Sequence, residues 1–367
     1  MSRTRRWLIV AAGLALLVSA PAVVSALPVA ASSISAAQLL ARLNGSGGVA
    51  YSGYAESSGG LALPVTQQYS ALANLFGDTT QLRVWSRGVS DWRVDSLSAS
   101  GETDLYADTA GTWTWDYEKN LVIRTTYGPN QLRLPLDADL LPSNLARRLL
   151  SEASPGEVSR LATRRIAGRA AAGLRLRPDT ATSTIDRVDV WVDEASGVAL
   201  RVEVYARGGA APSLTTAFLD FHTGDPSPDV TDFIPPPNAT VREDEQPDIA
   251  SAVNRYGQLT PPTALAGLPR NTLLEGITRV GTYGHGVTEL AAIPLPASTA
   301  DGLREQLMKV PGITTTPQYQ LGAIGPVSLL LGPDLHERAA WLLVGTLTPP
   351  TLREALSQLP TILRWRQ

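Results

Sequence analysis

Few side chains of this chain could perform catalysis. It contains three histidines, His222, His285 and His336, and no cysteine. No segment has the Gly-x-Ser-x-Gly pattern of a serine nucleophile, the His-Glu-x-x-His pattern of a zinc protease or the Gly-Lys-Ser/Thr ending of a phosphate loop. The lack of cysteine also excludes thiolate metal sites, disulfides and a lipid-modified cysteine. We therefore expect no catalytic residue, no metal site, no cofactor and no enzyme activity.

Three other groups could still suggest chemistry, and each has a plainer interpretation. The glycine-rich residues 281–286 do not open a helix after a strand, which favours a turn between strands over a phosphate-binding loop. Asp137 and Asp139 could form the carboxylate pair of a glycosidase, but two acids in one loop are common. The third group lacks the spacing of a calcium loop and is interpreted as solvent-facing charge around a hairpin. It consists of Asp189, Asp193 and Glu194.

One pattern indicates binding. Aromatic residues occupy every second position at Trp113, Trp115 and Tyr117. In a strand all three project from one face, where they could line a cavity for an apolar guest. The alternative is that they pack the sheet against helices, as most aromatic stripes do.

The beginning of the chain is typical of an export signal. Arg3, Arg5 and Arg6 precede an apolar run that extends to Ala31. Cleavage near Ala26 fits the small-x-small rule, and an uncleaved membrane anchor is the alternative. We expect an exported protein of the cell envelope. With a net charge of −3 and no basic cluster, nucleic acid is not an expected partner.

The elements that must position these residues are mainly strands. The amphipathic pattern of residues 35–44 and 143–152 predicts two helices, with Leu39, Leu43 and Leu149 on their apolar faces. Turn signals separate short alternating segments that predict an antiparallel meander. The predicted strands are residues 49–56, 81–87, 91–97, 103–108, 112–117, 120–127, 174–177, 187–193, 199–207 and 213–222.

Alternation in two of these strands defines an apolar face. Val188 and Val190 alternate with polar residues in one strand, and Val202 and Val204 do so in the next. So many strands and so few helices are most economically arranged as an α+β fold in which an incomplete antiparallel β-barrel wraps around the helices.

Composition divides the chain of 367 residues into segments. Residues 1–31 are the signal or anchor, and residues 32–223 form the half-barrel domain. Residues 224–265 are rich in proline and acid and predict a linker, in which residues 224–248 are expected to lack regular structure. Residues 266–367 predict a smaller C-terminal α+β domain.

Short motifs on these elements carry a family resemblance. They are residues 37–42, 50–53, 82–85, 91–94, 111–116, 166–169, 174–176, 187–193, 197–202, 233–237 and 343–350. In this order they resemble the LolA-like and RseB-like superfamily (MucB/RseB and outer membrane lipoprotein-sorting proteins), whose members handle lipids or sense envelope state. The resemblance implies the half-barrel described above, with an apolar cavity for acyl chains or a lipidated partner.

The expected site is therefore an apolar, lipid-binding surface under the curled sheet. It comprises Trp113, Trp115, Val188, Val190, Val202, Val204, Leu39, Leu43 and Leu149. The expected function is a non-enzymatic carrier or sensor of lipid or lipoprotein. The main alternative is an RseB-like regulator that binds a membrane-anchored anti-sigma factor through its C-terminal domain, and an enzyme of envelope polymers is a third hypothesis.

Overall fold

The computed structural model describes Trp7 and residues 31–59, 79–98, 101–126, 136–245, 259–271, 279–310, 312–335 and 338–361. The export signal and its cleavage site, apart from Trp7, lie outside the described residues, as does His336. Within the described ranges, no helix combines the length and apolarity needed to cross a membrane.

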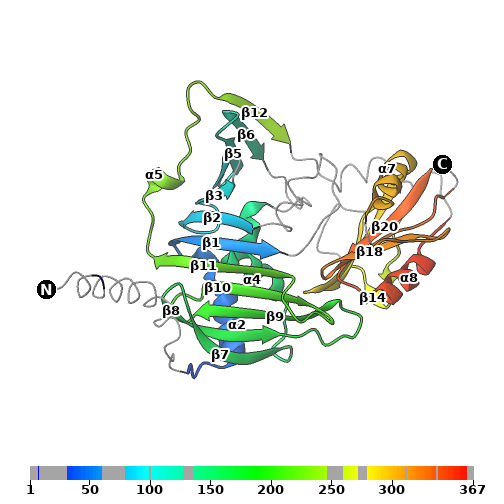
Figure 1. The fold of residues 1–367 in the computed structure, drawn as a ribbon, viewed down its shortest axis with the longest axis horizontal. Helices are drawn as coiled ribbons and strands as arrows, with labels where there is room; N and C mark the ends of the chain where they lie inside the picture. The colour runs from blue at the N-terminus through cyan, green and yellow to red at the C-terminus, as the bar shows by residue number, and fades with distance from the viewer. Residues whose placement is uncertain are drawn as a thin grey trace.

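The first domain is built on one large sheet, with strand order β12-β6-β5-β4-β3-β2-β1-β11-β10-β9-β8-β7 (Figure 1). Neighbouring strands are antiparallel except for β12 and β6, which are parallel. The strands are β1 Tyr51–Gly59, β2 Thr79–Ser86, β3 Trp92–Ser98, β4 Gly101–Asp108, β5 Gly111–Asp116, β6 Leu121–Thr126, β7 Val158–Ile166, β8 Arg169–Leu176, β9 Ile185–Asp193, β10 Ala199–Ala206, β11 Leu214–Thr223 and β12 Thr240–Glu245. This large, open antiparallel sheet confirms the predicted fold class.

Two helices cover one face of this sheet, behind β7 to β11 in Figure 1. α2 (Ala36–Asn44) begins at Ser35, whose side chain accepts a hydrogen bond from the backbone of Gln38 in a capping box. α4 (Pro142–Leu150) has proline in its first turn and follows the short η3 helix (Asp137–Leu140). Both helices bury their leucines against the sheet, as the apolar stripes of the sequence predict.

The C-terminal domain is a six-stranded sheet with order β15-β16-β20-β19-β18-β17 and two helices. Its elements, after the short hairpin β13 Ala264–Leu265 and β14 Leu268–Pro269, are β15 Gly281–His285, β16 Thr288–Pro296, α7 Ala297–Leu307, β17 Thr314–Thr315, β18 Gln320–Ile324, β19 Val327–Leu331, β20 Ala339–Gly345 and α8 Pro349–Gln358. Trp341 and Leu343 of β20 are buried in one core with Leu352 of α8. The predicted turn in residues 281–286 is the β15–β16 hairpin, with positive φ at Gly284 and Gly286.

The predicted linker 224–265 contains regular structure, which corrects the sequence prediction. Residues 228–231 form the one-turn helix α5, and residues 240–245 form β12, which pairs with β6 at the edge of the main sheet. Pro228 occupies the first turn of α5, where it removes no helical hydrogen bond. The acidic residues of β12 suit an edge strand, which pairs on one side only. Residues 246–258 lie outside the described part of the chain.

The two domains are hydrogen-bonded to each other through their backbones. Ser183 and Leu347 form an antiparallel β-bridge. Beside it, the Thr184 N–H donates to Thr346 O at 2.8 Å, and the Thr348 N–H donates to Thr182 O at 2.8 Å. Direct β pairing therefore joins the domains in addition to the connecting chain.

Candidate functional site

The valines and helix leucines of the predicted site come together as the sequence predicts. Val188, Val190 and Val202 are fully buried in one cluster with Leu39 and Leu43. Val204 belongs to the same cluster, and Leu149 packs against its edge. These side chains contact one another and the sheet, so they form a packed core, and Leu149 also lines a cavity.

Trp113 and Trp115 are not on that face, and their predicted place is wrong. Strand register aligns Trp115 with Asp104, and Trp113 with Tyr106. The alternate residues of the same strands, such as Leu105, belong to the core that contains Leu140 and the other residues at the start of α4. The tryptophans therefore lie on the face opposite the helices.

The opposite face has its own aromatic cover. The ring of Phe233, from the segment that follows α5, lies 4.5 Å from the ring of Tyr106, 5.8 Å from Trp113 and 6.1 Å from Trp115 (centroid distances). The Arg124 guanidinium lies 4.6 Å from the centroid of the Trp113 ring. The tryptophans thus hold the returning segment on the sheet.

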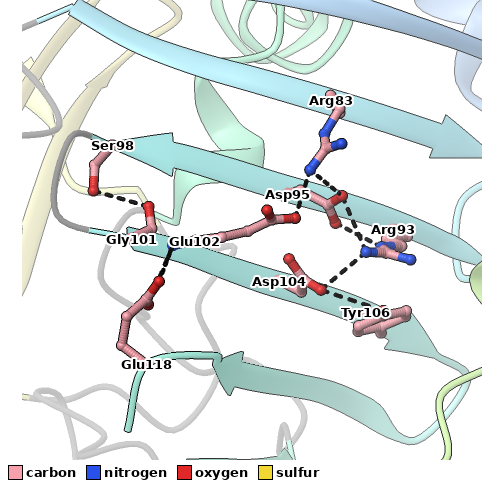
Figure 2. Close-up of polar contacts among 9 residues, drawn as sticks. All are labelled: Arg83, Arg93, Asp95, Ser98, Gly101, Glu102, Asp104, Tyr106 and Glu118. Atoms are coloured by element: carbon pink, nitrogen blue, oxygen red, sulfur yellow. Dashed lines mark hydrogen bonds and ion pairs between the residues drawn. The ribbon is translucent and has the colours of Figure 1, made fainter. Parts of the chain in front are cut away.

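A buried charge cluster lies on this same face (Figure 2). Asp95 and Asp104 are 0% and 3% exposed. The Arg93 guanidinium donates from Nε to Asp95 Oδ1 at 2.5 Å and from a terminal nitrogen to Asp104 Oδ2 at 2.9 Å. Arg83 donates to Glu102 Oε1 at 2.5 Å. Arg93 therefore bridges the two buried carboxylates, and Arg83 pairs with the carboxylate of Glu102.

The two buried carboxylates have raised pKa values. Burial, followed by the charge of Asp95, raises the pKa of Asp104 to about 7. Burial also raises the pKa of Asp95, although Arg93 opposes this shift. Asp104 Oδ1 is buried without a hydrogen bond, so no donor stabilises a negative charge on that oxygen.

The same carboxylates could hold a cation by distance alone. Oxygens of Asp95, Glu102 and Asp104 lie within 4.8 Å of one another. However, Arg83 and Arg93 contact these oxygens and neutralise two of the three possible negative charges. A metal ion would have to displace or repel both guanidinium groups, so we interpret the cluster as a structural ion network.

The other acidic groups singled out by the sequence also have structural partners. Asp139 accepts the backbone N–H of Leu136 at 2.8 Å and so stabilises η3. Asp189 and Asp193 are 3% and 4% exposed and accept paired hydrogen bonds from Arg175 and Arg169. The expectation that these two aspartates face solvent is therefore wrong. Alternation in β9 could have indicated this, because the residues between its valines occupy the second face of a central strand.

A cavity of about 190 Å³ lies between the two domains. The first domain contributes Leu149 from α4, Ala153 from the segment after it and Leu176 from β8. The C-terminal domain contributes Leu268 and Val287, the latter from the tip of the β15–β16 hairpin. Below we call it the interdomain pocket. Its walls combine one residue predicted for the site, Leu149, with residues that no sequence motif marks.

Hydrogen bonding fixes the mouth of the interdomain pocket. The Gly286 N–H of the hairpin donates to Glu152 Oε2 at 2.7 Å, just beyond α4. Glu157, Asp179 and His285 also line the pocket. The pocket therefore has apolar and acidic walls and includes parts of both domains.

Comparison with known proteins finds similar folds and identifies no family. No protein-family profile and no curated protein sequence match the chain. Among solved structures, it is similar to the MucA/MucB complex structure from Pseudomonas aeruginosa, at 15% identity and a TM-score of 0.49 over 88% of this chain and 97% of that one. It is also similar to a LolA superfamily protein from Nitrosomonas europaea, at 13% identity and a TM-score of 0.25 over 55% and 99%.

An uncharacterized conserved protein from Thermus thermophilus is similar at 11% identity, with a TM-score of 0.36 over 57% of this chain and 99% of that one. MucB and the LolA superfamily are the kinds of protein that the sequence resembles, and this likeness is one of fold.

Proposed function

We propose that this chain is an extracytoplasmic, non-enzymatic binding protein and sensor that receives an apolar group of a lipid or lipidated protein in the interdomain pocket. The observation that supports this most is that the pocket walls come from both domains. Occupation of the pocket would change the contacts between α4 and the β15–β16 hairpin. A ligand would thereby bias the arrangement of the domains, which is what a sensor requires.

The size of the pocket favours a sensor over a carrier. Its volume is about 190 Å³, whereas sites that enclose a whole small molecule usually measure about 300–1,000 Å³. The pocket would thus hold one short alkyl chain or side chain, with most of a lipid outside.

A regulator that binds a membrane-anchored protein through the C-terminal domain is the second candidate. Two aliphatic residues of its sheet, Ile293 and Val344, are half-buried on the face opposite Leu343 and α8. Leu329 and Leu342 of the same face pack against α7. The part of this face that α7 leaves open supports association with a partner protein.

The proposed function can be tested with uncharged alkyl ligands. Calorimetric titration with n-alcohols of four to eight carbons should show affinity that increases with chain length and levels off near six carbons, the chain that fits the pocket. Leu268→Glu should remove this binding, because it places a charge in the apolar wall. Leu219→Glu, at a position 56% exposed on β11, is the matched control and should bind as the unmodified protein does. Absence of alcohol binding, or equal binding by Leu268→Glu, would contradict the proposal.

A further inference from the structure

We propose that the apolar group that enters the interdomain pocket ends in a cationic head, with the chemistry of a lysine side chain of the bound protein. This inference depends on the proposed function, because it concerns the same pocket. It specifies the charge of the ligand, which the apolar walls alone leave open.

The pocket lining is acidic. Among the described residues, three carboxylates line it, Glu152, Glu157 and Asp179, and neither lysine nor arginine does. His285 is the remaining titratable group of the lining. An anionic head group, such as a carboxylate or phosphate, would therefore be repelled at the mouth, whereas an ammonium group would be attracted.

Acceptor oxygens remain free for such a ligand. Glu152 uses Oε2 for the Gly286 N–H, and Glu157 uses Oε2 for the backbone and hydroxyl of Ser154. The second oxygen of each glutamate has no hydrogen bond to a described residue. An ammonium group has three donors and no acceptor, so it needs several oxygens at one place. The two glutamates and Asp179 can provide them.

The charge around the pocket supports this preference. The pKa of Glu289, next to the pocket residue Thr288, is raised by desolvation and by the charge of Glu152, while Arg148 and His285 lower it. The charge of Glu152 therefore also acts on Glu289, beyond the pocket lining.

The dimensions suit the stem of lysine. A chain of four methylene groups can lie along Leu149, Leu176 and Val287, with its ammonium group at the carboxylates. Both ends of such a side chain are then satisfied, the stem by apolar contact and the head by charged acceptors. A lysine between apolar residues of a partner segment has this chemistry.

Three ligands with the same six-carbon chain test the charge preference. Hexylamine, hexanol and hexanoate are titrated into the full-length protein at low salt and neutral pH. We expect hexylamine to bind about tenfold or more tighter than hexanoate, with hexanol between them, and the advantage should shrink as salt screens the carboxylates. A double variant, Glu152→Gln with Asp179→Asn, should lose the amine preference and keep hexanol binding. Glu305→Gln on α7 removes the same type of charge away from the pocket lining and should change nothing.

Peptide binding then tests the source of the amine. A blocked peptide Ala-Leu-Lys-Leu-Ala should compete with hexylamine, and the same peptide with glutamate in place of lysine should not. If hexanol binds but hexylamine has no advantage over hexanoate, the cationic ligand is refuted while the proposed function stands. If no hexyl compound binds, the proposed function fails first. If hexylamine binds and the lysine peptide does not compete, a partner lysine is the wrong source.

Discussion

Replacing Asp104 by asparagine should change how the stability of the protein depends on pH. Asp104 is 3% exposed, and its pKa is raised to about 7 by burial and by the charge of Asp95. An unfolded aspartate loses its proton near its ordinary value, 3.8. Between these pH values the folded protein binds more protons than the unfolded chain. Its free energy of unfolding must therefore fall as pH rises through this window.

The size of this effect follows from the two pKa values. The difference between 3.8 and about 7 corresponds to about 4 kcal/mol, at about 1.36 kcal/mol for each pH unit. Asparagine cannot ionise, yet its side-chain oxygen can still accept the Arg93 hydrogen bond. The free energy of unfolding of Asp104→Asn, relative to the unmodified protein, should therefore increase by up to about 3 kcal/mol between pH 4.5 and pH 8.

Urea denaturation at a series of pH values measures this difference. Asp193→Asn is a matched control at another buried aspartate. Burial alone would raise the pKa of Asp193, but hydrogen bonds from Arg169 and Ser196 lower it below 3.8. Asp193 is then ionised in both folded and unfolded states above pH 4.5, so its variant should be destabilised by a similar amount throughout, about 1–3 kcal/mol. A difference for Asp104→Asn that does not change with pH would refute the charge state assigned to the cluster.

Three further predictions concern the domain contact, the returning segment and the misplaced tryptophan. Leu347→Ala, at a fully buried position beside the interdomain bridge, should lower the free energy of unfolding by about 2–5 kcal/mol in urea titrations; a loss below about 1 kcal/mol would argue against tight packing there. Phe233→Ala should expose the segment around α5 to proteases, seen as faster cleavage between β11 and β12 in limited proteolysis. Trp115→Glu should reduce stability but leave hexanol binding unchanged; loss of binding by Trp115→Glu would return the site to the tryptophan face.

The sequence predicted the core well where two patterns agreed. Leu39 and Leu43 have helical spacing, Val188 and Val190 have strand spacing, and each apolar stripe needs a partner. Packing the helices on this face of the sheet buries both apolar stripes. The structure accordingly packs these residues together.

Trp113 and Trp115 were misplaced because alternation gives the period of a strand but does not say which face is covered by helices. In β5 the buried face carries the smaller side chains, such as Thr112, which is 3% exposed. The large aromatic side chains therefore suggested the wrong face of the strand. The deciding residue, Phe233, lies far away in the chain, in a segment whose prolines suggested a linker.

The interdomain pocket could not be predicted, because its walls depend on how two domains meet. Leu176 and Val287 have ordinary places in separate strands and turns. Their proximity depends on the bridge between Ser183 and Leu347, whose partners are distant in sequence. Local patterns contain no information about such a contact.

The pairing of β1 with β11 has a consequence for the order of folding. β1 forms hydrogen bonds with its neighbour in sequence, β2, on one side and with the last antiparallel strand of the domain on the other, where Tyr51 lies opposite Thr223. One arm of the sheet, β2 to β6, and the other, β7 to β10, can each form from local hairpins. The β1–β11 pairing that unites the two arms can form only after β11, at the far end of the domain, has reached β1. Because closing so large a loop is entropically slow, we expect the arms to form early and the β1–β11 pairing late. Truncation before β11 would leave two local meanders with no shared centre.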